Sequence, residues 1–245
     1  MRPFAALGVL TLLALLGALV ATHVTADQRP DVAQLERAGQ ARAGDPGPVL
    51  AQVDGLPITA ADLAERIAIV QANLDYMRQE AATGGPQADF LQEFARLIES
   101  AGVENAALGS LIVDRALMAE AQRRGLAPTG DEVARRVAQD RALAPQVDDP
   151  RMAAYIAVIG EERYWTVVYP ATVQQELAAQ RLWEAETGAV ADPVERQRAW
   201  TSVQARIIGR ARVTLVRPDL AAPATLEGAL AYLQRYWELY SNANR

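Results

Sequence analysis

Few side chains in this sequence could carry out chemistry. The only histidine is His23, and cysteine is absent. A Ser-His-Asp triad, a cysteine nucleophile and the common zinc sites therefore lack their central residue after position 23. Two carboxylate pairs remain, and we interpret Asp148-Asp149 as a turn and Glu161-Glu162 as a helix start, where negative charge is favourable. The sequence predicts no catalytic residue, no cofactor site and no metal site, and hence no enzyme.

Aromatic side chains offer recognition instead. Of the 14 aromatic residues, a group of five falls within residues 155–183. They are Tyr155, Tyr164, Trp165, Tyr169 and Trp183. Such a group fits two interpretations, ordinary packing between helices or an apolar, adaptable cleft that stacks on unfolded segments. The sequence leaves both open, and we take these five as candidate peptide-binding residues.

The N-terminal residues 1–26 are typical of a targeting segment. Arg2 precedes an uncharged apolar run, and the small residues Val24 and Ala26 suit a signal peptide cleaved after Ala26. The run is also long enough to remain as a membrane anchor of about 19 residues. In both cases we expect the rest of the chain in the periplasm or on the outer face of the cytoplasmic membrane. Residues 27–47 form a polar linker with Gly and Pro.

Charge argues against nucleic acid as a partner. The net charge is −6, and acidic and basic residues are interspersed without a basic block. All cations except the histidine are arginines, which we attribute to composition rather than to function.

The elements that would position the aromatic group are mostly helices. Apolar residues recur at helical spacing from Leu63 to Met77, and again over residues 90–98 and 104–124. Capping-box patterns at Thr59 and Thr129 mark two helix starts. We further expect helices on either side of Pro170, one opened by Asp192-Pro193, and one at residues 226–240. The last has an apolar face of Leu226, Leu230, Leu233 and Trp237, and we expect it to dock onto the body rather than on a membrane or partner.

Two short segments have the alternation of strands. Apolar side chains recur at every second position at Val49, Ala51 and Val53, and a β-branched alternating segment follows at residues 211–217. A single strand leaves its backbone groups unsatisfied, so we expect residues 49–53 and 212–216 to pair. The fold class predicted is a mainly α body closed by a small two-stranded sheet that joins its ends.

Four segments resemble the SurA N-terminal domain, the helical chaperone module of extracytoplasmic foldases of the SurA and PrsA type. "VLAQVDGLPITAADLAER" is similar to the opening of that module, with Asp54 where asparagine is usual. "LIVDRALMAEAQRRGLAPTGDEV" resembles its central helical segment. "IGEERYWTVVYP" and "RARVTLV" resemble a later helix and the closing strand. The resemblance covers residues 48–217, so the expected domains are 1–26, 27–47, 48–217 and a C-terminal linker and amphipathic helix at 218–245.

The resemblance also shows a departure from the foldases. Their peptidyl-prolyl isomerase activity belongs to a parvulin domain of about 90 residues, whose site uses histidines. At the corresponding position this chain has only the short segment 185–193, and no histidine follows His23. The resemblance thus implies a chaperone module without its isomerase domain.

The function expected from the sequence is that of an extracytoplasmic, non-catalytic chaperone. It would bind unfolded or extended segments of exported proteins as a holdase, and it would touch the membrane through residues 1–26 if these are not cleaved. A scaffold or assembly subunit bound to one fixed envelope partner is the alternative. An isomerase-related protein without activity of its own is the third possibility.

Overall fold

The computed structural model describes residues 46–85, 87–147, 149–217 and 224–243. The targeting segment predicted at residues 1–26 and nearly all of the linker at 27–47 lie outside these residues. Among the described helices, none combines the length and the apolarity that crossing a bilayer requires.

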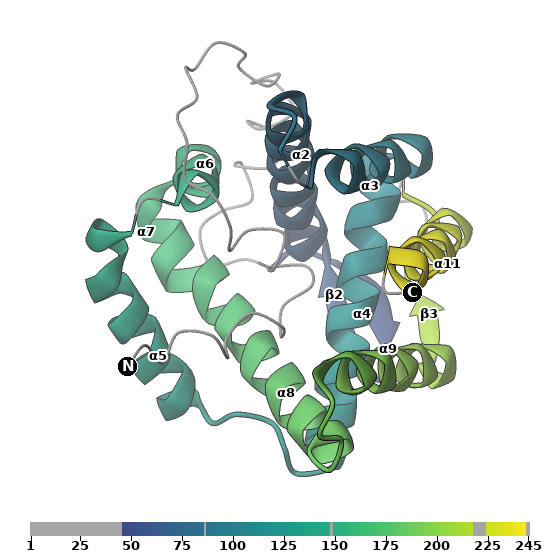
Figure 1. Ribbon diagram of the computed structural model, residues 1–245. Helices are drawn as coiled ribbons and strands as arrows, with labels where there is room; N and C mark the ends of the chain where they lie inside the picture. Colours follow the sequence, from purple (N-terminus) through teal and green to yellow (C-terminus); the bar gives the residue numbers. More distant parts are fainter. Residues whose placement is uncertain (1–45, 86, 148, 218–223, 244–245) are drawn as a thin grey trace. The chain divides into compact units, whose positions relative to one another are not determined.

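The described residues form two compact units (Figure 1). Unit 1 is the continuous stretch Ala116–Gly209, whereas unit 2 is built from the residues up to Arg115 and those from Arg210 onward. The helix α4 (Val103–Arg123) contributes residues to both units. Unit 1 is therefore inserted in the chain between the two parts of unit 2.

Unit 2 contains the only sheet of the described residues, with strand order β2-β1-β3. The predicted pairing is confirmed, because β1 (Val49–Val53) and β3 (Val213–Leu215) are antiparallel, with Gln52 opposite Thr214. The sheet has a further strand, β2 (Leu56–Thr59), which the sequence did not lead us to expect before the helix start at Thr59. The turn between β1 and β2 explains this difference. Asp54 and Gly55 both have positive φ, +50° and +85°, as a tight hairpin turn requires.

Three helices of unit 2 follow the apolar patterns closely. They are α2 (Ala60–Ala82), α3 (Ala88–Ala101) and the first part of α4. The predicted capping box begins α2: the Asp62 N–H donates to Thr59 Oγ1 at 3.2 Å, and the Thr59 N–H donates to the Asp62 carboxylate at 2.9 Å. Leu63, Leu74 and Met77 of its apolar stripe are buried.

The C-terminal helix α11 (Leu226–Ala243) docks within unit 2, where it packs against α3. Its buried face differs from our expectation, because Leu230 is 45% exposed while Ala229, Tyr232, Leu233 and Tyr236 are buried. Gly109 of α4 explains the rotation. A Cβ atom there would lie 2.9 Å from the Tyr232 ring and 3.2 Å from the Ala229 carbonyl oxygen, so the absent side chain admits α11 at close range.

Unit 1 is entirely helical where it is described. After α4 it contains α5 (Gly130–Leu143), the 3₁₀ turn η1 (Ala144–Gln146), α6 (Pro150–Ile159), α7 (Glu161–Arg163), the π-helix η2 (Tyr164–Val168), α8 (Tyr169–Thr187) and α9 (Pro193–Arg210). Thr129 caps α5 with the predicted box.

Pro170 does not separate two helices as predicted. Helical turns continue from Glu161 to Thr187, and the π-helix lies directly before the proline. Proline has no N–H for the carbonyl four residues earlier, and a wider turn at that point relieves the mismatch.

Candidate functional site

The π-helix brings three of the five candidate aromatic residues together. Its wider turn closes with the Tyr169 N–H donating to the Tyr164 carbonyl, which places these two side chains one above the other. The ring of Trp165 meets those of Tyr164 and Tyr169 edge to face, each at a centroid distance of 5.0 Å. Tyr164 is 6% exposed and Trp165 5% exposed, whereas Tyr169 is only partly buried. The trio is thus a packed aromatic floor within unit 1.

Polar groups join this floor to α5. The Tyr169 hydroxyl donates to the Asp140 carboxylate at 2.9 Å, and Arg136 Nε donates to the same oxygen at 2.6 Å. Burial, aided by this hydrogen bond, raises the pKa of the Tyr169 phenol. The guanidinium of Arg141 lies 5.9 Å from the centroid of the Trp165 ring, a cation–π distance. Because no side chain of α5 is fully buried, these contacts are a substantial part of what holds α5 in place.

Glu176 adds a titratable group to the same cluster. Burial raises its pKa to about 6, an effect that Arg136 partly offsets and Asp140 reinforces. The cluster has no nucleophile beyond these oxygens, and no group of residues in the described part of the chain could hold a metal ion. Its chemistry is limited to ion pairing and to proton uptake near pH 6.

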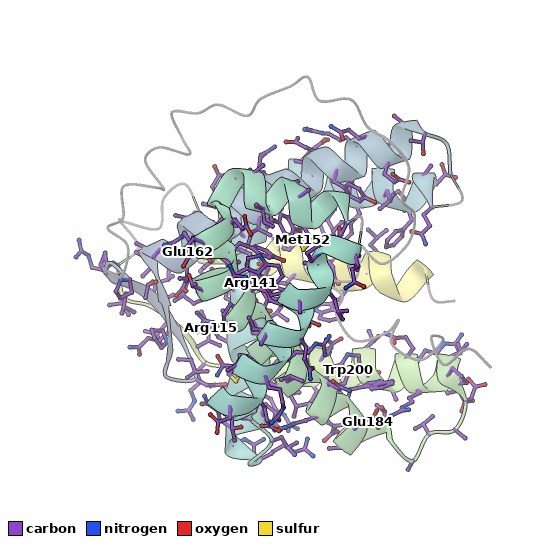
Figure 2. The ribbon with its side chains drawn as sticks, turned by 90° about the vertical axis from the view of Figure 1, so that its left-hand side faces the viewer. Arg115, Arg141, Met152, Glu162, Glu184 and Trp200 are labelled. Atoms are coloured by element: carbon purple, nitrogen blue, oxygen red, sulfur yellow. The ribbon has the colours of Figure 1, made fainter. Side chains whose placement is uncertain are left out.

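Apolar side chains lie exposed on the elements around this floor. The helix α6 has the sequence PRMAAYIAVI, yet none of its described side chains is buried. Leu143 and Val147, on either side of η1, are 53% and 56% exposed, and Val167 of the π-helix is 48% exposed. We call Leu143, Val147, Met152, Tyr155, Ile156 and Val167 the α6 surface, in which the three residues of α6 are half-buried and the other three are exposed. Figure 2 labels Met152 on α6 and Arg141 on α5. Apolar residues gathered on and around one helix without full burial mark a candidate binding face.

The five candidate residues thus fall into different settings. Tyr164, Trp165 and Tyr169 are in mutual contact, and Tyr155 lies half-buried on α6. Trp183 does not join them, because it lies 14 positions after Tyr169 on the same helix, or about 21 Å along its axis. Its ring instead carries the guanidinium of Arg196 at 3.7 Å.

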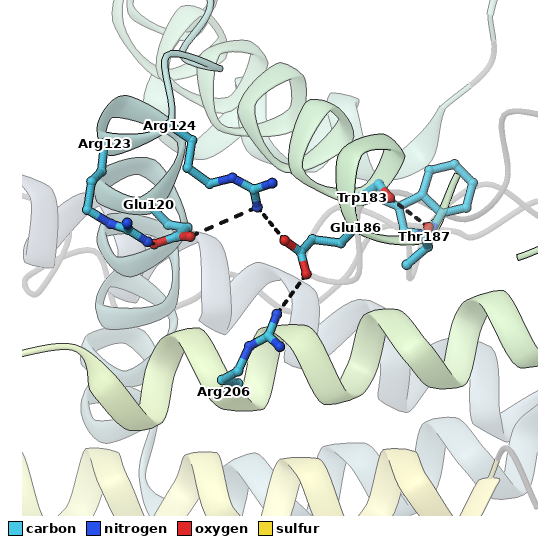
Figure 3. Close-up of polar contacts among 7 residues, drawn as sticks. All are labelled: Glu120, Arg123, Arg124, Trp183, Glu186, Thr187 and Arg206. Atoms are coloured by element: carbon cyan, nitrogen blue, oxygen red, sulfur yellow. Dashed lines mark hydrogen bonds and ion pairs between the residues drawn. The ribbon is translucent and has the colours of Figure 1, made fainter. Parts of the chain in front are cut away.

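A second polar network lies near Trp183 and fastens the helices there. Glu186 of α8 accepts hydrogen bonds from Arg124, the residue after α4, at 2.5 Å and from Arg206 of α9 at 2.7 Å (Figure 3). Thr187 donates to the Trp183 carbonyl at 2.6 Å. Burial alone would raise the pKa of Glu186, but the hydrogen bonds from Arg206 and Arg124 lower it. The carboxylate therefore stays charged and has a structural role.

Sequence reasoning missed the polar partners and the exposed apolar residues. The spacing of Arg136 and Asp140, four positions apart on one helix, was a signal that could have found the ion pair. Nothing in the sequence distinguishes exposed Val167 from buried Val168, because both are valines of one helical turn.

The comparison with protein families gives a match over most of the chain. The model of the family described as "SurA-like N-terminal domain" matches residues 10–183. The matched stretch ends at Trp183, so α9, β3 and α11 fall beyond it. Neither the curated proteins nor the solved structures contain a match to this chain.

Proposed function

The chain belongs to the SurA-like N-terminal domain family, a chaperone-like family, and on that premise we propose that it is a non-catalytic chaperone. It binds extended or unfolded segments of exported proteins and slows their aggregation, without ATP or metal. It acts on the outer side of the cytoplasmic membrane, and residues 1–26 direct its export.

The observation that carries this proposal is the accessible α6 surface. Unfolded segments expose apolar side chains without a fixed shape, so a receptor for them needs apolar area that is not already covered. Met152 and Tyr155 are suited to this task, since a thioether and a phenol ring adapt to varied partners. The buried Tyr164 and Trp165 lie on the same π-helix as Val167 and pack with Tyr169, which fixes that part of the surface. Trp183 lies at a separate position on α8.

An aggregation assay tests the proposal with a matched pair of variants. The full chain, kept in mild detergent, is mixed with a denatured, unrelated protein, and light scattering follows the aggregation of that protein. Val147→Asp places a charge on the α6 surface, and Val194→Asp places the same charge on α9. The two valines are 56% and 55% exposed, so neither change disturbs the folded core.

We expect the wild type and Val194→Asp to delay aggregation equally, and Val147→Asp to do so several-fold less well. Equal protection by all three proteins would remove the α6 surface from the proposal. No protection by the wild type, with one protein crosslinked to it in cells at fixed stoichiometry, would favour the scaffold subunit instead.

A further inference from the structure

The sheet of unit 2 has two edges, and the edge formed by β2 is closed. Pro57 in the middle of β2 has no N–H to offer to a further strand. Its carbonyl oxygen accepts a hydrogen bond from Arg115 Nε at 2.9 Å, and the guanidinium of Arg115 is held by Asp62 at 3.1 Å. A strand added beside β2 would find neither donor nor acceptor at this residue.

Within the described residues, no strand pairs with the edge formed by β3. The N–H of Asp54, the residue after β1, donates to the Arg212 carbonyl at 3.0 Å, and the Val216 N–H donates to the Leu50 carbonyl of β1 at 2.8 Å. In an antiparallel ladder, every second residue directs its backbone N–H and C=O groups toward the same neighbouring strand. Thr214 lies midway between Arg212 and Val216, so its backbone groups also face β1. The N–H and C=O groups of Val213 and Leu215 therefore point away from β1, and no described strand lies on that side.

The strand β3 has one apolar face and one polar face. On the inner face, Ala51 and Val53 are fully buried, while their partners Val213 and Leu215 are only half-buried. On the outer face, Arg212 and Thr214 are exposed and line a shallow polar depression with Gln52, Asp54 and Gly55. Exposed Arg210 adds a second positive charge beside the strand.

We propose that the β3 edge takes up an extended segment of a client protein as a fourth, antiparallel strand. This rests on the proposed function and assigns it a second contact, separate from the α6 surface. Backbone hydrogen bonds to Val213 and Leu215 give affinity that does not depend on the client sequence. Apolar side chains of the client cover Val213 and Leu215, and the alternating side chains, polar or acidic, lie beside Thr214 and Arg212.

Charge favours a client over a second copy of this chain. Two β3 strands side by side would place the exposed Arg210 and Arg212 of both copies along one seam, and like charges close together across strands are unfavourable. A client segment with acidic flanks meets the opposite sign. The edge therefore selects segments that alternate apolar and polar residues between carboxylates.

Fluorescence anisotropy tests the proposal on the full chain in mild detergent. The probe is a labelled short peptide of alternating valine and threonine with glutamate at both ends. Leu215→Pro removes the outward N–H and blocks the edge with its ring, but it removes no hydrogen bond to β1. Leu215→Ala trims the same side chain and keeps the N–H. We expect Leu215→Pro to weaken peptide binding about tenfold or more, and Leu215→Ala to weaken it about threefold or less.

A second measurement uses the wild type alone. It is decisive if circular dichroism shows that the proline variant is unfolded. Methyl groups on those peptide nitrogens that face β3 should abolish binding, whereas methyl groups on the intervening nitrogens should leave it. Replacing the glutamates by lysines should weaken binding several-fold at low salt. Equal binding by both methylated peptides, or equal loss by both, would overturn strand addition.

The remaining outcomes separate this inference from the proposed function. Unchanged peptide binding by a folded Leu215→Pro, with aggregation still delayed, would reject the β3 edge and keep the chaperone. A dimer that Leu215→Pro dissociates would assign the edge to a second copy. Tighter peptide binding after deletion of residues 27–45 would mean that this segment of the same chain, and not a client, occupies the β3 edge. Peptide binding without any protection from aggregation would reject the chaperone function.

Discussion

At the scale of single residues, Glu176 is the group with the clearest dependence on pH. Its pKa is raised from 4.5 to about 6 because it is taken out of water on α8, and Arg136 compensates only in part. An acid that holds its proton more tightly when folded weakens the fold once that proton is lost. Loss of the proton lowers the free energy of unfolding by at most about 2 kcal/mol. This loss is complete above pH 6 and fades as the pH falls toward 4.5.

We expect Glu176→Gln to be more stable than the wild type at pH 7.5 and equally stable near pH 4.5. Urea unfolding at a series of pH values measures this difference. Glu132 is a useful contrast, because hydrogen bonds from Thr129 lower its pKa to about 2. The stability that ionised Glu132 adds to the fold is present above pH 4.5 and is lost only below that value. This range lies below the range of pH 4.5 to 6 over which Glu176 acts. A variant Glu176→Gln with the same pH profile as the wild type would show that the carboxyl group is not desolvated.

Trp165 and Val167 are a second contrast between residues, two positions apart on the π-helix. Trp165 is 5% exposed in the aromatic floor, and Val167 is 48% exposed. We expect Trp165→Ala to lower the free energy of unfolding by about 3–5 kcal/mol, and Val167→Ala to change it by less than about 0.5 kcal/mol. Thermal melting measures both. A Trp165→Ala protein that melts like the wild type but no longer delays aggregation would make Trp165 a contact residue.

At the scale of elements, the close approach of α11 to α4 depends on a missing side chain. Gly109→Ala puts a Cβ atom within 2.9 Å of Tyr232, on a helix that cannot recede without losing Tyr236 and its edge contact with Phe94 at 5.6 Å. Gly209 lies in α9 with nothing within 4 Å of the same added atom.

The two glycines should therefore respond in opposite directions to alanine. Gly209→Ala should stabilise by about 0.5–1 kcal/mol, because alanine is the better helix former. Gly109→Ala should destabilise by about 1–3 kcal/mol, because overpacking displaces α11. Circular dichroism during chemical unfolding gives both values. Stabilisation by Gly109→Ala would mean that α11 is not seated as described.

The same elements show what the sequence could predict. Capping boxes and apolar stripes are local, so the starts of α2 and α5 and the buried residues of α2 follow from a few neighbouring positions. The pairing of β1 with β3 followed from the need of each strand for a partner. The strand β2 was not predicted, because Pro57 cannot donate to a sheet ladder, although Asp54-Gly55 is a strong hairpin signal.

Features set by distant contacts were out of reach. The face that α11 buries depends on Gly109, more than a hundred positions earlier, and the π-helix depends on how Pro170 is accommodated. For the candidate site, the sequence located the aromatic trio within a wider group of five. It could not separate Trp183 from the trio or identify the exposed Val147, because exposure is a property of the folded unit.

At the scale of the whole molecule, the prediction of export is the one to test in cells. Arg2, the apolar run and the small residues near Ala26 predict that the body lies outside the cytoplasmic membrane. We expect protease added to spheroplasts to digest the body, while a cytoplasmic marker stays intact. Mass spectrometry of the N-terminus should find Asp27 if the segment is cleaved, or Met1 if it anchors the chain. A protected full-length band would contradict the prediction of export.

The insertion of unit 1 between the two parts of unit 2 has a consequence for biosynthesis. A ribosome adds about 5–20 residues per second. Once β1, β2, α2 and α3 have emerged, all of Ala116–Gly209 must be made before β3 and α11 follow, which takes roughly 5–20 s. During this interval one edge of β1 has no partner strand, and the surface around Gly109 lacks α11. Unit 2 is therefore incomplete until the residues after Gly209 are available. Slow or interrupted synthesis should make this protein, itself a proposed chaperone, a client of other chaperones.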